Sequence, residues 1–274
     1  QCISLFNSFL LMSMPDLALE VLTNAKKKFK SYPFNFQEAD FYAQKQEKEK
    51  MIESYLSLLD KHDYYQEAVQ KALLRRLDLD SEESKEFQLL KGAFFARAKK
   101  ESSGVMFSEM LIWLYSQVDN FEGVFNQVVA VDIRSKANGY RLFDFGMVCR
   151  ENKDYQTAIR AFQEAMTISS ADELKMKSQV GILNVGYIKV AKLKTYTVEE
   201  LQKIISHYEE VLEKIQTPNS RTLSIVLEYA ELLAYHYGDR EKALKVLSET
   251  EKSPMLTDIL KAKVKILRAD IEVL

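Results

Sequence analysis

The chain has 274 residues, a formal net charge of −2 at pH 7 and a pI near 6.1. This balance argues against general electrostatic binding to nucleic acid, which normally shows as a basic excess or a concentrated basic face. Only 8 Gly and 4 Pro are present, too few chain breakers for a many-turned β-sheet protein. We therefore predict an all-α protein.

The N-terminal segment CISLFNSFLLMSM, from residue 2, lacks the basic leader of a signal peptide, and we interpret it as a helix of a repeat. The following segment, PDLALEVLTNA, places Ala18, Leu22 and Ala25 on one helical face. The chain begins with Gln1 and ends in an amphipathic helix without a covering partner. We expect it to belong to a longer protein with further repeats or domains.

Similar helical patterns continue toward the middle of the chain. The segment HDYYQEAVQKAL spaces Tyr65, Ala68 and Ala72 in the same way, and residues 82–99 predict an extra helix. The longest apolar run, MLIWLY at residues 110–115, is far shorter than the roughly 20 residues that cross a bilayer. We therefore expect no membrane insertion.

Two adjacent segments match each other at a regular spacing of about 34 residues, a period used by helical repeat proteins. DNFEGVFNQVVAV, from residue 119, aligns with KDYQTAIRAFQEA, from residue 153. The matched pairs are Leu111 and Phe145, Tyr115 and Cys149, Phe121 and Tyr155, Val124 and Ala158, Val128 and Phe162, and Val131 and Ala165. This period predicts two repeats, at residues 105–138 and 139–172.

The second of these repeats resembles the tetratricopeptide repeat (TPR) family. It carries Leu142, Phe145-Gly146, Cys149, Ala158 and Phe162 at the family's spacings, with Leu142 in place of Trp and Cys149 in place of Tyr. The resemblance implies two helices that cross closely at Gly146 and Ala158. It also implies a right-handed α-α superhelix with irregular repeats. Neither a Gly/Ser linker nor a low-complexity tract divides the sequence, so we predict a single domain covering residues 1–274.

Looser copies of the pattern divide the rest of that domain. We predict irregular units at residues 1–34, 49–104, 174–217 and 224–256, a terminal helix at 257–274, and about ten to thirteen helices in all. Capping-box spacing predicts helix starts at Thr197 with Glu200, Ser170 with Glu173 and Asp80 with Glu83, and Ser253-Pro254 predicts another.

Residues that could carry catalysis are few and scattered. His62, His207 and His236 lack metal-ligand spacing, and Cys2 and Cys149 define neither a disulfide framework nor a metal motif. We therefore expect no catalytic residues, no metal, no cofactor and no enzymatic activity. An enzymatic alternative requires a pocket that closes over His207 or His236.

The family resemblance implies a concave groove, lined by the first helix of each unit, that holds a peptide or a partner helix. Trp113, the single tryptophan, either marks this surface or packs on an irregular neighbouring helix. Arg150 with Glu109 and Asp144 favours a basic or mixed apolar segment over a clamped C-terminal carboxylate. The predicted groove comprises Met106, Glu109, Met110, Trp113, Gln117, Tyr140, Phe143, Asp144, Met147, Arg150, Glu228, Tyr229, Leu232 and Tyr235, with His236 beside it.

Two functional hypotheses follow from these patterns. The first is a non-catalytic scaffold that binds a protein or peptide partner in the groove. The alternative is a regulatory or peptide-sensing segment of a larger signalling protein. A cytoplasmic origin and a bacterial periplasmic or surface origin both remain open.

Overall fold

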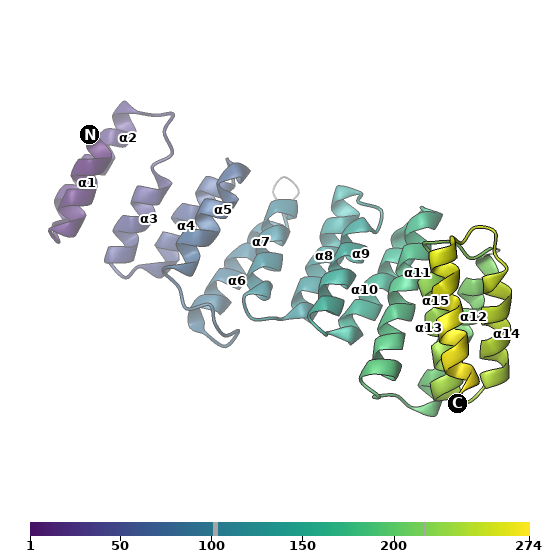
Figure 1. Cartoon of the computed structure of the whole chain (residues 1–274). Helices are drawn as coiled ribbons and strands as arrows, with labels where there is room; N and C mark the ends of the chain where they lie inside the picture. The colour runs from purple at the N-terminus through teal and green to yellow at the C-terminus, as the bar shows by residue number, and fades with distance from the viewer. Residues whose placement is uncertain (101–103, 216) are drawn as a thin grey trace. The chain divides into compact units, whose positions relative to one another are not determined.

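A computed structural model describes residues 1–100, 104–215 and 217–274 (Figure 1). Over these residues the chain is all-helical and contains no strand, which confirms the all-α part of the predicted fold class. It has fifteen α-helices there, more than the ten to thirteen predicted. Within the same residues, no helix is both long enough and apolar enough to cross a bilayer.

The described chain divides into two compact units, Gln1–Val131 and Asp132–Leu274. The prediction of a single domain over residues 1–274 stays a prediction. The first unit holds α1 (Cys2–Leu11), α2 (Pro15–Lys28), α3 (Asn35–Gln44), α4 (Lys48–Leu59), the 3-10 helix η1 (Asp63–Tyr65), α5 (Gln66–Leu74), α6 (Lys85–Ala98), α7 (Gly104–Ser116) and most of α8 (Phe121–Ser135).

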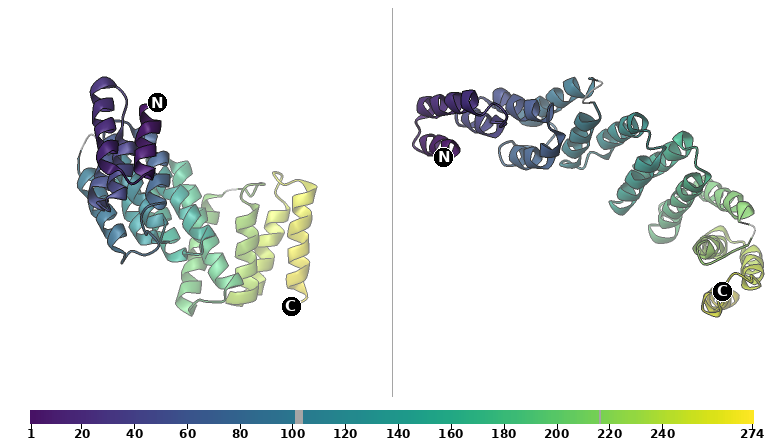
Figure 2. Two further views of the ribbon diagram at one scale, coloured as in Figure 1. Left: turned by 90° about the vertical axis from the view of Figure 1, so that its left-hand side faces the viewer. Right: turned by 90° about the horizontal axis from the view of Figure 1, so that it is seen from above.

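The second unit continues as a series of helices in which sequence neighbours pack together. In Figure 2, α9, α10 and α11 follow one another side by side, and each is in contact with the next. The elements are α9 (Tyr140–Glu151), α10 (Tyr155–Ile168), α11 (Asp172–Tyr187), η2 (Ile188–Lys192), α12 (Val198–Lys214), α13 (Leu223–Leu232), η3 (Leu233–Tyr237), α14 (Arg240–Glu251) and α15 (Asp258–Glu272). Both η2 and η3 are single π-helical turns.

One predicted helix start is confirmed in atomic detail. The Thr197 hydroxyl accepts from the Glu200 backbone N–H at 3.2 Å, and the Glu200 carboxylate accepts from the Thr197 N–H at 2.9 Å. This is a complete capping box, which satisfies two of the backbone donors that a helix N-terminus leaves unpaired. It fixes the start of α12.

The other three predicted starts, at residues 80, 170 and 253, are wrong. Each lies within four residues of a real start. Only α6 has a side-chain cap among these three, while α11 and α15 begin without a side-chain cap hydrogen bond, so cap chemistry does not mark their starts. The actual N-caps are Ser84 for α6, whose hydroxyl accepts from the Phe87 N–H, Ala171 for α11 and Thr257 for α15.

The same tight turn recurs between successive helices. In each case a residue with a left-handed backbone is followed by one whose N–H donates to the carbonyl five residues earlier, as in the Schellman motif. The left-handed residues are Ser13, Gln46, Asp119 and Lys153, and the bonds are Met14 to Phe9 (2.9 Å), Glu47 to Tyr42 (3.0 Å), Asn120 to Tyr115 (3.1 Å) and Asp154 to Cys149 (2.9 Å).

The Phe162 ring forms the centre of the packing among α9, α10 and α11. Phe162 is fully buried, and glycines face both edges of its ring. A Cβ at Gly146 would lie 2.7 Å from Phe162 Cε1, and a Cβ at Gly181 would lie 2.8 Å from Cε2. Gly146 and Gly181 are therefore small because one large ring occupies the space between their helices.

A buried carboxylate holds the start of α9. Asp132 accepts from the Gly139 N–H at 2.8 Å and from the Arg141 N–H at 3.1 Å. Gly139 has φ of +86°, a conformation that glycine adopts at little steric cost. This geometry sets the entry of the chain into α9, the first helix to line the site described next.

Candidate functional site

An open cleft lies in the second unit. Its walls come from α9, α11, the end of α12, the segment around Asn219 and the first half of α13, and it has a volume of about 860 Å³. We call it the α9–α13 cleft. Residues of α9, α11 and α13 all line it, so the cleft runs across three helices.

Apolar side chains from several helices line the middle of the cleft. They include the half-buried Phe143, whose ring lies 5.6 Å from that of Phe162. Phe162 thus supports the floor of the cleft from below. The apolar lining is Phe143, Met147, Met176, Val180, Ile215 and Ile225.

A chain of hydrogen bonds joins the three helices at one end of the cleft. The Arg150 guanidinium donates to Asn184 Oδ1 at 3.2 Å, and Asn184 Nδ2 is 3.4 Å from Glu228 Oε1. From behind, the hydroxyl of the buried Tyr208 donates to Glu228 Oε2 at 2.8 Å. Because Asn184 accepts on one side and donates on the other, its amide orientation is fixed by its neighbours.

Burial raises the pKa of Glu228 above its usual value of 4.5. The hydrogen bonds from Tyr208 and Asn184 act in the opposite direction, as does the Lys192 charge, while the Glu231 charge raises the pKa further. Desolvation is the largest of these effects because a half-buried carboxylate loses part of its hydration. The neutral form of Glu228 is therefore favoured more in the folded chain than in the unfolded chain.

Glu228→Gln should remove a pH dependence of stability. Because the native pKa is raised, the folded state binds the Glu228 proton more tightly, so this group stabilises the fold at low pH and loses that contribution as pH rises through the native pKa. The stability of the variant relative to wild type should increase with pH above 4.5. Urea unfolding of both proteins from this pH up to neutral pH measures the effect, and a pH-independent difference would contradict it.

Cations gather at the opposite end of the cleft, where α11 and α13 begin and α12 ends. Lys177 pairs with Glu173 at 2.7 Å, and Lys214 Nζ lies 3.4 Å from Gln179 Oε1. Lys214 and Arg221 are exposed. We call Lys177, Lys214 and Arg221 the cationic end. With Arg150, the cleft lining holds four cations against two carboxylates, Glu173 and Glu228.

Four predicted groove residues meet in this cleft. Phe143, Met147 and Arg150 reach it from α9, and Glu228 reaches it from α13. Among the remaining predicted residues of the second unit, Tyr140, Asp144 and Tyr235 are exposed outside the cleft lining, whereas Tyr229 and Leu232 are buried in the core. Tyr229 instead donates to Glu209 at 2.8 Å. We leave Tyr229 and Leu232 out of the site.

The other five predicted residues belong to the first unit. Met106, Glu109 and Trp113 are half-buried on α7, and the exposed Gln117 donates to the Trp113 carbonyl at 2.9 Å. Met110 is fully buried. Neither Glu109 nor Asp144, the carboxylates that favoured a basic partner, lines the α9–α13 cleft.

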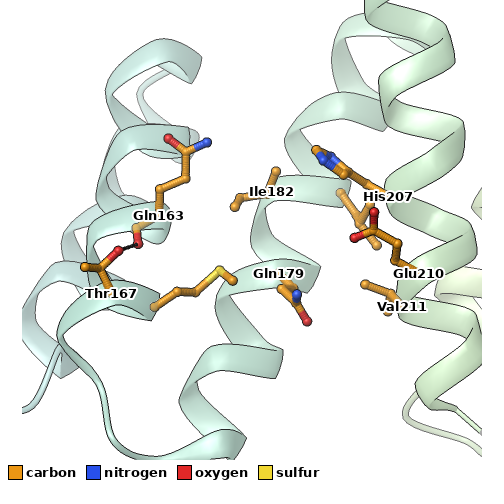
Figure 3. Close-up of a pocket in the computed structure, with 9 residues that line it drawn as sticks. Gln163, Thr167, Gln179, Ile182, His207, Glu210 and Val211 are labelled. Atoms are coloured by element: carbon orange, nitrogen blue, oxygen red, sulfur yellow. Dashed lines mark hydrogen bonds between the residues drawn. The ribbon is translucent and has the colours of Figure 1, made fainter.

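His207 lines a second cavity of about 490 Å³ between α10, α11 and α12 (Figure 3). His207 and Glu210 face Gln163 and Thr167 across this cavity, and the Thr167 hydroxyl donates to the Gln163 carbonyl at 3.1 Å. Over the described residues, no group of three or more His, Cys, Asp and Glu side chains is placed to hold a metal ion.

His236 lies elsewhere, near the end of η3. Its Nδ1 is 3.2 Å from the Tyr196 hydroxyl. Burial lowers its pKa from 6.5, and the Lys194 charge lowers it further. The structure does not place His236 and His207 in a common pocket.

The sequence contained a signal for two cleft residues that were missed. Adding one repeat period to Phe143 and Arg150 gives Lys177 and Asn184, and both line the cleft. Lys214 and Arg221 carried no such signal, because they lie at a helix end and in a connection where the repeat register is lost.

A scan against models of protein families finds no match to this chain, and a search of curated proteins finds no similar sequence. The functional argument therefore rests on the geometry of the chain's own residues.

Proposed function

We propose that this chain is a helical repeat solenoid of the TPR kind that binds a protein or peptide partner in the α9–α13 cleft without catalysing a reaction. The recurring left-handed turn supports the repeat architecture. It occurs at Asp119 and Lys153, which are one repeat period apart, and at Ser13 and Gln46.

Compensating side-chain volumes give further support to the repeat register. Tyr115 on α7 packs against Gly123 on α8, where a Cβ would lie 2.6 Å from the tyrosine ring. The positions one period later are Cys149 and Thr157, both buried. A large and a very small residue are thus replaced by two of intermediate size, as expected of equivalent positions that fill similar spaces.

The observation that carries the functional proposal is the composition of the cleft. An apolar strip crosses three helices and has hydrogen-bonding groups at one end and cations at the other. Clefts of this kind bind partner side chains in the apolar part and use a few polar groups to set orientation. Arg150 and Glu228 are already held through Asn184, which suits fixed recognition groups better than groups that must transfer protons.

A peptide selection tests the proposal. We expect random peptides displayed on phage to yield ligands for the full chain that lose roughly tenfold or more in affinity, about 1.4 kcal/mol, on Ser224→Trp. Ser224 is exposed and lines the cleft, so tryptophan obstructs the cleft without disturbing the core. The matched control is Ser206→Trp, at an exposed position on α12 outside the cleft.

Fluorescence anisotropy with the selected peptides measures both affinities. Equal binding to wild type and Ser224→Trp would place the ligand elsewhere and overturn the proposal, as would a selection that enriches no ligand. Loss of binding on Ser206→Trp but not on Ser224→Trp would move the site to the side of α12.

A further inference from the structure

The α9–α13 cleft has a direction, because its two ends differ in chemistry. At one end, Lys177, Lys214 and Arg221 lie where α11 and α13 begin. At the other end, Arg150, Asn184 and Glu228 form a hydrogen-bonded chain. The apolar strip separates the two ends. A bound segment therefore meets cations first, then apolar surface, then polar groups that are already hydrogen-bonded to one another.

The positive charge at the cationic end is only partly neutralised by the protein. Among the residues that line this end, the carboxylate present is Glu173, which pairs with Lys177. Lys214 contacts a neutral amide oxygen, and Arg221 projects from the segment before α13 as an exposed side chain. The N-terminal ends of α11 and α13 add partial positive charge at the same place, and the single C-terminal end of α12 offsets part of it.

Glu228 does not offset this excess. It lies at the far end of the cleft, and its raised pKa shows that burial disfavours its charged form. Arg150 lies at the same end as Glu228, bonded to Asn184. The charge that a ligand encounters at the cationic end is therefore positive.

From this arrangement we infer that the cleft's ligand is an acidic-apolar segment of a partner protein, with Asp or Glu side chains over Lys177, Lys214 and Arg221 and apolar side chains directly beside them. This inference rests on the proposed function and adds the chemistry and direction of the ligand. The inferred ligand groups are side-chain carboxylates and not a C-terminal carboxylate. The cleft is open at its rim, so a segment from within a partner chain can reach the cationic end without ending there.

Two designed peptides test the inference by fluorescence anisotropy with the full chain. One carries a block of four Glu followed by Leu, Phe and Ile, and the other has Lys in place of Glu; both have amidated C-termini. The Glu peptide should bind more tightly, and its affinity should fall severalfold as NaCl rises from about 50 mM to about 0.5 M, because salt screens exposed charges.

Charge reversal locates the interaction. Lys214→Glu with Arg221→Glu should weaken the Glu peptide roughly tenfold and strengthen the Lys peptide, since each exposed pair contributes modestly and reversal turns attraction into repulsion. The matched control, Lys245→Glu with Lys263→Glu, changes the net charge equally at exposed positions on α14 and α15 outside the cleft and should leave both affinities unchanged.

The outcomes separate this inference from the proposed function. Tighter binding of the Lys peptide, blocked by Ser224→Trp, would overturn the acidic ligand but keep the cleft as a binding site. If the control variant Lys245→Glu with Lys263→Glu weakens binding of the Glu peptide as much as Lys214→Glu with Arg221→Glu does, the loss of affinity reflects net charge alone. That result would also overturn the inference. Binding of the Glu peptide only when its C-terminus is a free carboxylate, and not when it is amidated, would overturn the inference and assign the ligand to a chain terminus.

Discussion

Phe162→Ala should lower the free energy of unfolding of the second unit by about 3–5 kcal/mol, the range observed when a large aromatic side chain is truncated in a core. The loss should lie high in this range because the cavity cannot close easily. Gly146 and Gly181 line it with backbone, so no neighbouring side chain at these positions can turn inward to fill it. Urea unfolding followed by far-ultraviolet circular dichroism measures the change.

Tyr140→Ala provides the control for this substitution. Tyr140 is an aromatic residue of α9 with 46% of its surface exposed, so its removal should change stability by less than about 0.5 kcal/mol. A loss of similar size for Tyr140→Ala and Phe162→Ala would contradict the central packing role of the Phe162 ring.

Gly139→Ala should destabilise the second unit by about 2–4 kcal/mol, because a left-handed backbone for a residue with a side chain and steric overlap in a packed region both add cost. The added Cβ would lie 2.6 Å from the Ala165 carbonyl oxygen, which is backbone and cannot rotate away. Because Gly139 also donates to Asp132, a shift that relieves the overlap would weaken that hydrogen bond.

Gly92→Ala should change stability in the opposite direction from Gly139→Ala. Gly92 lies in the interior of α6, and no neighbouring atom lies within 4 Å of the position that a Cβ would occupy, so alanine should stabilise the helix by about 0.5–1 kcal/mol. Thermal unfolding of both variants provides the comparison. Equal shifts of the same sign would show that the Ala165 carbonyl does not constrain residue 139.

The fold class could be predicted because it depends on composition and local periodicity, which the sequence displays directly. Gly146 and Ala158 were also predicted to lie at a close helix crossing; the structure buries Ala158 and leaves no room for a Cβ at Gly146 beside the Phe162 ring. Helix starts were less predictable. Several polar residues before α6 can cap a helix, and Ser84 is the one that does so, whereas the N-cap residue of α15, Thr257, makes no side-chain cap hydrogen bond that a motif could reveal.

The candidate site was predicted only where it follows the repeat register. Phe143, Met147 and Arg150 were recognised as one face of a helix, and the structure brings them to a cleft. Tyr229 and Leu232 were assigned to the same kind of face but lie in the core. In that region the repeat is longer than the period of the two clear units, and the helical register alone could not tell which face α12 and α14 cover.

The single tryptophan, Trp113, lies in the first unit, whereas Phe162 and Gly139 lie in the second. Trp113 fluorescence therefore reports unfolding of the first unit, and far-ultraviolet circular dichroism reports loss of helix in both units. Comparing the two unfolding transitions measures folding cooperativity along the chain. If Phe162→Ala moves the dichroism transition but leaves the emission midpoint in place, the two units unfold independently. If both midpoints move together, neighbouring helices transmit the loss, as in repeat proteins whose interfaces couple each unit to the next.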